Sequence, residues 1–553
     1  MGGGIVLCSR QLLCGVLGFA RDDGIVVGFS RASVRVLDAF PSPRMLECMR
    51  RAFGIETEYG ITVDGAASVD VVAESIELVR SYARGGAQMK WDYALEDPHR
   101  DARGFRAKEL LQDTDESAYF EIDKNRPLSF EEIKSDLVLA NGARFYNDHA
   151  HPEYSTPECT TLEEIVAHDK AGERILALCA SGRNLALPPG QEVRLYKNNT
   201  DFVGHSYGCH DNYLMRRDVA WDRVVAGAIP FLVTRQIFAG AGKLGIETES
   251  AAGEAGIYQI SQRADFFSVL VSIDTMNRRP IVNTRDEPHA DKSRYRRFHV
   301  IIGDANMSEW ATAMKIGTTA LVLDLIEQGQ APQIELADPI AAVKAISREP
   351  GHRWLVQQKN GKTISAIDLQ RLYLRAAQVA TAPRDAETTW LLREWERVLN
   401  ELEREPALTV DRVDWVTKHS LLSAFQEEEK LSWDDPWLQA IDLEYHNVDP
   451  ERGLYFELLK QGKVRRTVHD DQVNAAIVSP PGTTRAFLRG LAVSRFNDSI
   501  ASIQWDEVVF KHRGGRRVLS LPETAGGARL EILNAAVRDA VDFPDFLRRI
   551  DGQ

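Results

Sequence analysis

The stretch FGIETEYG, residues 53–60, alternates between two kinds of side chain. Mostly large or β-branched residues stand at the odd positions, whereas Glu56 and Glu58 stand at even positions. A period of two is typical of a half-buried β-strand, so both glutamates would project from one face of a sheet. At about 3.3 Å of rise per residue their Cβ atoms would lie roughly 6 to 7 Å apart, close enough to repel without an intervening cation or water. A solvated acidic face is the alternative, because exposed glutamates are common.

A second strand with an unusual polar face is predicted at ARFYND, residues 143–148. Arg144, Tyr146 and Asp148 occupy alternate positions, so one face would carry a basic, a phenolic and an acidic group. An edge strand with its polar residues turned to solvent would explain the pattern equally well for one strand alone. Two strands with the same feature favour a functional face.

Two further segments combine imidazoles with charged groups. In CHDN, residues 209–212, His210 and Asn212 again occupy alternate positions. The second segment precedes a helix predicted at about 308–328 and contains Arg285, Asp286, Glu287, His289, Arg296, Arg297 and His299. Such groups suit a metal-bound anion such as a nucleotide polyphosphate, because arginines bind phosphate oxygens and carboxylates bind magnesium. A single histidine of this kind is more often a hydrogen-bonded core residue. The common glycine-rich phosphate loops are absent from the sequence.

Helical periodicity appears at residues 161–180 and 385–403. In the second segment Leu391, Trp395, Val398 and Leu402 recur at helical spacing, which indicates packing against a core. Near the C-terminus, Pro480 and the next proline precede a predicted helix at 483–496 and two predicted strands at 505–511 and 516–521. We therefore expect a small domain at 481–553, following a large domain at 49–480.

Composition narrows the class of protein. With 553 residues, 44% hydrophobic and 27% charged, the chain has the make-up of a globular protein of two or more domains, or of one large domain with an appendage. The formal charge of −14 argues against general binding of nucleic acid. The six cysteines form no C-x-x-C motif, which favours a reducing cytoplasm over a disulfide scaffold.

Residues 1–48 are expected to be an N-terminal extension outside the fold. Their apolar run contains Arg10 and is too short to span a bilayer, whereas the sequence from Met49 leads directly into the first strand. A signal peptide is the alternative.

Three motifs together carry a family resemblance. They are E-T-E on the first strand, G-x-H-x-N at 208–212 and R-x-H-x-x-x-x-D-A-N at 297–306. Their order resembles the carboxylate–amine ligase superfamily of glutamine synthetase. Within that superfamily the sequence is most similar to the family of the Pup ligase and the Pup deamidase, or depupylase. The resemblance runs from about residue 50 to the C-terminus and includes GIETEYG, NGARFYNDHAHPEYSTPEC, LYKNNTD, PFLVTRQ, ISQRADF, NTRDEPHADKSRYRRFHVIIGDANMSE and PPGTTRAFLRG.

An insertion distinguishes the two branches of this family. Residues 88–105, QMKWDYALEDPHRDARGF, resemble a loop that depupylases carry and ligases lack. The spacing between Asp148 and the following H-P-E also resembles the depupylase form. The alternative is a disordered surface loop. That would explain its polar content but not Trp91, Tyr93 and Phe105, whose aromatic rings favour burial or a binding partner.

The resemblance implies a fold and a set of site residues. The fold would be α+β: a large glutamine synthetase-like domain whose curved antiparallel sheet forms a cradle backed by helices, plus a small α/β C-terminal domain. Magnesium-binding positions of the family match Glu56, Tyr146 and Glu153, and the glutamine synthetase pattern adds Glu58, His210 and His299. Nucleotide-contacting positions match Arg144, Thr156 and Trp505. His299 stands where glutamine synthetase has a glutamate.

The resemblance also implies an activity. Asp148 matches the family's essential aspartate, either as a nucleophile that forms an anhydride or as a base for water. The substrate would be the C-terminal glutamine amide of Pup, or the isopeptide bond between Pup and a lysine of a pupylated protein. Arg144 and magnesium would stabilise negative charge, ATP would be required but not consumed stoichiometrically, and the link to the proteasome would be indirect. Neither nucleic acid nor a membrane is an expected partner.

Three other functions are alternatives. A Pup–protein ligase would couple the glutamate of Pup to target lysines, and the insertion argues against it. A small-molecule glutamate ligase would need a closed amino-acid pocket. A non-catalytic Pup-binding adaptor would not need Asp148 and the acidic strand.

Overall fold

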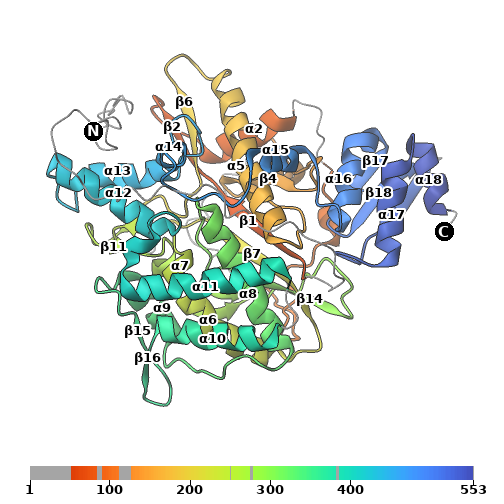
Figure 1. Ribbon diagram of the computed structural model, residues 1–553. Coiled ribbons are helices and arrows are strands. Elements are labelled where there is room, and N and C mark those ends of the chain that lie inside the picture. The colour runs from red at the N-terminus through yellow and green to blue at the C-terminus, as the bar shows by residue number, and fades with distance from the viewer. Residues whose placement is uncertain are drawn as a thin grey trace.

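The computed structural model describes residues 51–83, 90–110, 126–248, 251–274, 278–381, 385–512 and 514–551. The predicted extension at 1–48 lies outside the described residues. The described part is a mixed α+β structure built around one large sheet, with helices on its apolar side (Figure 1).

The central sheet has eight strands in the order β12-β13-β14-β7-β1-β5-β4-β3. All neighbouring pairs are antiparallel except β12 and β13, which run parallel. In that order the strands are β12 (Val269–Ser272), β13 (Pro280–Asn283), β14 (Tyr295–Val300), β7 (Cys209–Arg216), β1 (Phe53–Glu58), β5 (His151–Ser155), β4 (Arg144–Asp148) and β3 (Leu137–Val138). β1 therefore lies near the middle of the sheet, where strands from distant parts of the chain meet.

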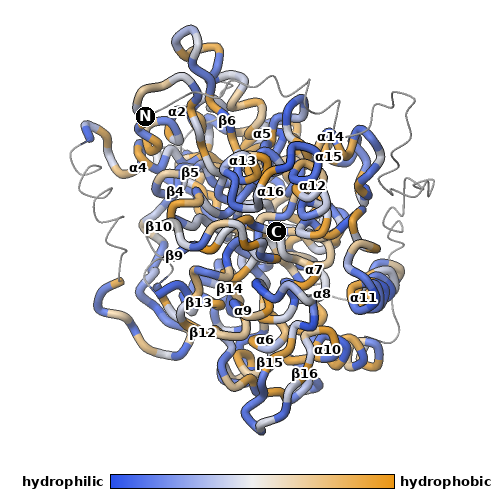
Figure 2. Tube along the Cα trace, turned by 90° about the vertical axis from the view of Figure 1, so that its left-hand side faces the viewer, coloured by the Kyte–Doolittle hydropathy of each residue, from blue (hydrophilic) through white to orange (hydrophobic). Residues whose placement is uncertain are grey.

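One face of these strands is apolar and packs on helices. Phe53, Ile55 and Phe298 belong to a large buried cluster that also contains Trp310 and Met314 of α8 (Glu309–Glu327). The other α-helices described in the large unit are α2 (Val71–Ala83), α4 (Phe130–Lys134), α5 (Leu162–Asn184), α6 (Trp221–Thr234), α7 (Gln236–Ala239), α9 (Pro339–Arg348), α10 (Ala366–Ala380), α11 (Ala386–Arg404), α12 (Asp414–Glu429), α13 (Pro436–Tyr445), α14 (Leu454–Lys460) and α15 (Asp470–Val478). Hydrophilic and hydrophobic residues alternate along helices such as α10 and α11 (Figure 2). The predicted core positions of α11, from Leu391 to Leu402, are buried.

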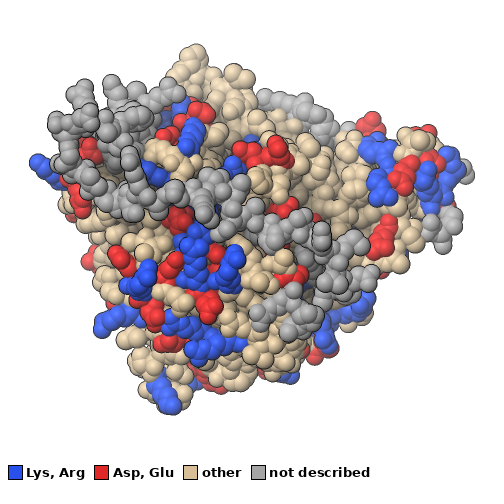
Figure 3. Space-filling model, viewed as in Figure 1, with Lys and Arg blue, Asp and Glu red and all other residues tan. Residues whose placement is uncertain are grey.

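Short strand pairs complete the large unit. They are β2 (Gly60–Asp64) with β6 (Glu192–Tyr196), β8 (Lys243–Leu244) with β11 (Tyr258–Gln259), β9 (Glu247–Thr248) with β10 (Ala251–Ala252), and β15 (Leu355–Gln357) with β16 (Thr363–Ser365). On the face seen in Figure 3, acidic and basic side chains are interspersed. None of the described helices is both long enough and apolar enough to cross a membrane.

The last elements of the chain gather at one side of the molecule, blue in Figure 1. They are α16 (Arg485–Phe496), β17 (Ile500–Ile503), β18 (Glu507–His512), β19 (Gly515–Ser520), α17 (Ala528–Asp539) and α18 (Phe543–Asp551), with β17, β18 and β19 in one antiparallel sheet. The helix and the two strands expected after Pro480 are thus confirmed. These elements share a buried cluster of their own, which also contains Trp91 and Val138.

The described part of the insertion, from Lys90 onward, is packed between the C-terminal elements and the large sheet. Trp91 is only 7% exposed and meets Trp505 edge to face, with ring centroids 5.4 Å apart. Its backbone neighbours pair with Ile503, and Asp101 accepts a 2.6 Å hydrogen bond from Thr284. Phe105 is not buried, because it is 50% exposed, and its ring meets the guanidinium of Arg103 at 4.9 Å. One end of this segment is thus part of the core, whereas Phe105 lies at the surface.

Candidate active site

The register of the strands assembles the polar side chains of the sheet. Glu56 of β1 lies opposite His210 of β7, and Glu58 lies opposite Glu153 of β5. On the next strand, β4, Tyr146 also faces Glu153. Since a period of two puts alternate side chains on one face, residues separated by up to about 150 positions in the chain come together on the side of the sheet away from α8.

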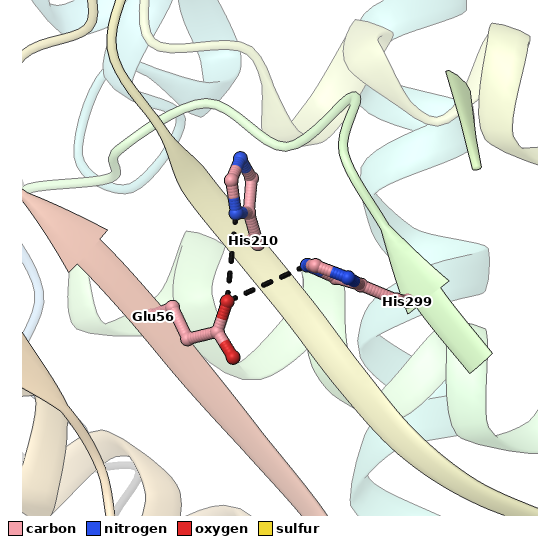
Figure 4. A group of neighbouring side chains, drawn as sticks. All are labelled: Glu56, His210 and His299. Carbon is pink, nitrogen blue, oxygen red and sulfur yellow. Dashed lines mark ion pairs between the residues drawn. The ribbon is translucent and has the colours of Figure 1, made fainter. Parts of the chain in front are cut away.

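The first cluster consists of Glu56, His210 and His299 (Figure 4). The Oε2 atom of Glu56 lies 3.5 Å from His210 Nδ1 and 3.4 Å from His299 Nε2. Burial alone would raise the pKa of Glu56, but the two imidazoles and Arg297 lower it well below its usual range. Burial and the charge of Arg297 lower the pKa of His299 to about 3. The cluster therefore presents a carboxylate beside two imidazoles, groups that bind metals in proteins.

The second cluster consists of Glu58, Asp148 and Glu153, whose carboxylate oxygens lie within 4.8 Å of one another. Burial and the charge of Asp148 raise the pKa of Glu58 to about 7. Burial and the neighbouring carboxylates raise the pKa of Glu153 well above its usual range. Tyr146 donates a 2.7 Å hydrogen bond to Glu153 Oε1, so it orients this acid. Three crowded carboxylates favour either proton uptake or a cation between them.

Both clusters fit divalent cations. Carboxylate oxygens suit magnesium, and the crowding of Glu58 and Glu153 is the electrostatic strain that a cation would relieve. His299 Nδ1 is buried without a hydrogen-bond partner among the described residues, whereas Nε2 is directed toward Glu56, where a shared cation would lie between the two groups. Glu56 and Glu58 thus belong to different clusters, because Glu56 lies beside β7 and Glu58 beside β5. The sequence did not predict this division.

Asp148 has a basic partner that the sequence analysis missed. Lys134, the last residue of the short helix α4 (Phe130–Lys134), donates a 2.6 Å hydrogen bond to Asp148 Oδ1. His149 Nδ1 lies 3.4 Å from the other carboxylate oxygen. Burial would raise the pKa of Asp148, but these two groups lower it well below its usual range. Asp148 is therefore held as a carboxylate, the form required of a nucleophile.

Arg144 is paired with an acid of its own. Its Nε atom donates a 2.9 Å hydrogen bond to Asp136 Oδ1, and its Nη2 atom donates to Asp136 Oδ2 and to the hydroxyl of Tyr93. The guanidinium lies 4.0 Å from the ring centroids of both Trp91 and Tyr146. The insertion and the β4 strand therefore meet at this arginine, which does not line the cavity described next.

A cavity opens beside the first cluster. Glu56 and Arg297 lie at its polar end, whereas Thr156 and Trp505 contribute to its walls. The side chain of Thr156 also accepts a 3.0 Å hydrogen bond from the backbone of Ile55, which fixes this wall to β1. Two of the three expected nucleotide-contacting residues, Thr156 and Trp505, therefore face one cavity, and the third, Arg144, lies apart from it.

A buried ion-pair network joins the C-terminal elements to this cavity. Glu158, which follows β5, accepts hydrogen bonds from Arg485 at 2.7 Å and from Arg489 at 2.5 Å. Arg489 also donates to the backbone carbonyls of Gly142 and Trp505. Sequence patterns could not predict these contacts, because the partners are 327 and 331 positions apart.

Comparison with known proteins identifies relatives over most of the chain. Residues 51–509 match the family model described as Pup-ligase protein. A depupylase of Acidothermus cellulolyticus is 44% identical over 496 residues, which are 88% of this chain and 96% of that protein. A Pup deamidase/depupylase of Mycobacterium tuberculosis is 41% identical over 512 residues, covering 89% and 97% of the two chains. A Pup–protein ligase of Actinosynnema mirum is 41% identical over 414 residues, 73% of this chain and 90% of that protein.

Two solved structures share the fold. One is the complex between Pup and its ligase PafA, with a TM-score of 0.71 and 31% identity, covering 91% of this chain and 95% of that chain. The other is PafA in complex with ADP, with a TM-score of 0.66 and 33% identity, covering 79% and 97%. Both structures are of a ligase, so the structural match shows the family fold and does not separate its two branches. Among the sequence relatives named above, the two depupylases match 88% and 89% of this chain and the ligase 73%.

Proposed function

This chain belongs to the Pup-ligase protein family, and from that premise we propose that it is a Pup deamidase and depupylase. It hydrolyses amide bonds at the C-terminus of Pup: the carboxamide of a terminal glutamine, or the isopeptide bond to a lysine of a pupylated protein. The observation that carries the choice between branches is the insertion at 88–105. Its described part is packed against Trp505 and Arg144. The two depupylase relatives also match a larger share of the sequence, 88% and 89%, than the ligase relative, 73%.

The cofactors we propose are ATP and magnesium. The ADP complex of a relative and the cavity lined by Thr156 and Trp505 support nucleotide binding here. Glu56, His210 and His299 would hold one cation, and Glu58 with Glu153 a second, with Tyr146 orienting Glu153. Bound magnesium would neutralise these carboxylates and the phosphates of the nucleotide. We also propose that residues 49–480 form the glutamine synthetase-like catalytic domain, and that residues 481–553 form a small domain that carries Trp505 to the nucleotide.

Asp148 is the proposed nucleophile. Its carboxylate oxygen would attack the amide carbon, and collapse of the tetrahedral adduct would break the carbon–nitrogen bond as the nitrogen takes up a proton from water, which releases ammonia or the lysine amine. Water would then hydrolyse the anhydride, which restores the Asp148 carboxylate and leaves a glutamate on Pup. The low pKa of Asp148 supports this role over that of a base, because a carboxylate held ionised accepts a proton poorly. Arg144, held by Asp136 beside the same strand face, would stabilise negative charge.

The proposed partners are Pup and pupylated proteins, which link the enzyme indirectly to the proteasome. The structure of a related ligase with Pup supports the first. We place the reaction in the cytoplasm, where the buried thiols of Cys159, Cys179 and Cys209 would stay reduced.

The test is deamidation of Pup that ends in glutamine. With ATP and magnesium, the parent protein should convert the terminal amide to an acid, detected as a mass gain, whereas Asp148→Asn should lose at least about a hundredfold in rate while ADP affinity changes little. Formation of Pup–lysine conjugates from Pup ending in glutamate, without any deamidation, would instead identify a ligase.

A further inference from the structure

Lys134 contacts the carboxylate that the proposed reaction uses. Its ammonium lies 2.6 Å from Asp148 Oδ1, and the two side chains are 17% and 25% exposed. The same ammonium lies 5.7 Å from the ring centroid of Tyr146, the next residue along the strand face. This lysine belongs to none of the segments that carry the family resemblance.

The helix that carries Lys134 is fixed by hydrogen bonds. None of the side chains of α4 is buried, but Ser129 and Glu132 form a capping box at its start. Arg80 of α2 donates to the carbonyl of Glu132 at 3.0 Å, and Asn147 of β4 donates to the carbonyl of Ile133 at 3.2 Å. Because Asn147 precedes Asp148 on β4, the lysine and the aspartate are tied to the same strand. The contact is therefore part of the folded architecture.

Asp148 has two competing environments. Its oxygens lie within 4.8 Å of Glu58 and Glu153, the acids that would hold a cation. A third carboxylate that joined such a cation would lose its freedom to attack, since metal coordination withdraws charge from the oxygen. In the other environment, the Lys134 ammonium donates a hydrogen bond to Asp148 Oδ1. This contact neutralises the carboxylate charge without a metal and fixes the orientation of the side chain.

We propose that Lys134 is a positioning residue for Asp148, which holds the carboxylate in its attacking orientation and keeps it out of the coordination shell of the neighbouring cation. The inference rests on the proposed function. Lys134 itself neither forms nor breaks a bond in the reaction.

The experiment compares Lys134→Met and Lys134→Arg with the parent. Methionine keeps the length of the stem without the charge, whereas arginine keeps the charge. We expect Lys134→Met to lower kcat for deamidation at least about tenfold with little change in KM for Pup, because misplacement of a reacting group affects chemistry more than binding. Lys134→Arg should recover a substantial part of kcat. A matched control is Lys359→Met, which breaks an exposed lysine–glutamate pair of the β15–β16 hairpin and should leave kcat unchanged.

A second measurement does not depend on turnover. Magnesium titrations of ADP binding, followed by calorimetry, should reach half-saturation at several-fold lower magnesium in Lys134→Met than in the parent, because the released Asp148 becomes available to the cation. A kcat that is unchanged or raised in Lys134→Met, or an equal loss in both variants together with lost ADP binding, would overturn the inference. A parent that binds ADP but does not deamidate Pup would refute the proposed function, and this inference with it.

Discussion

Replacing Glu158 by glutamine should loosen the C-terminal elements and weaken nucleotide binding together. The side chain of Glu158 pairs with Arg485 and Arg489, which are 3% and 0% exposed. Burial raises the pKa of Glu158, but the charges of Arg489 and Arg485 outweigh it and lower the pKa from 4.5 to about 2. At about 1.4 kcal/mol per pKa unit, this lowering of the Glu158 pKa corresponds to about 3 kcal/mol of free energy in favour of the folded state with Glu158 ionised.

The sign of the pH dependence follows from that lowered pKa. The stabilisation is fully present above the unfolded value of 4.5 and is lost as the pH falls toward 2. Urea unfolding at pH 7 should therefore show Glu158→Gln less stable than the parent by about 3 kcal/mol, and the difference should shrink by about 1 kcal/mol between pH 5 and pH 3.5. Because Glu158, Arg485 and Trp505 all line the cavity, the dissociation constant of ADP should rise in the same variant.

A matched control is Glu335→Gln, which removes an exposed partner of Lys359 and should cost less than about 1 kcal/mol. The reasoning would be refuted by a Glu158→Gln protein as stable as the parent at pH 7. A loss of stability that is independent of pH would show that the carboxylate charge is not its cause.

Three other substitutions test separate parts of the site. Glu56→Ala should weaken magnesium-dependent ADP binding, because it removes the carboxylate shared by two imidazoles, and unchanged affinity by calorimetry would contradict its role as a ligand. Trp505→Ala should raise the dissociation constant of ADP several-fold, since aromatic contacts contribute about 1 kcal/mol; an unaltered constant would remove it from the nucleotide site. Trp91→Ala should destabilise the protein by about 3 kcal/mol while Phe105→Ala changes stability by less than about 0.5 kcal/mol, and equal effects in urea unfolding would mean that the insertion is not packed as described.

The sequence predicted the local part of the site well. Alternation along β1, β4 and β7 was sufficient to place Glu56, Glu58, Asp148 and His210 on polar strand faces, because the side-chain period of a strand is a property of the backbone. The core positions of α11 followed from helical periodicity for the same reason.

Sequence periodicity does not determine which strands become neighbours. The position of β1 between β7 and β5 depends on contacts over more than 90 residues of chain, so the division into two clusters could not be foreseen. Lys134 and Asp136 belong to no motif. They are linked to the site only through their contacts in the fold, with Asp148 and Arg144 respectively. Glu158 lies 327 and 331 positions from its two arginines, and a charged residue taken alone is typical of an exposed position.

Because Glu56 and Glu58 are two residues apart on β1, the backbone of this strand sets the distance between the two clusters. The spacing between their Cα atoms is set by covalent geometry, at roughly 6 to 7 Å, and no side-chain substitution can alter it. An insertion of one residue between them would turn one glutamate to the helix side of the sheet and dismantle one cluster while leaving the other intact. The distance between the two clusters is therefore a property of the β1 backbone, whereas the insertion and α4 contribute side chains around the sheet without changing it.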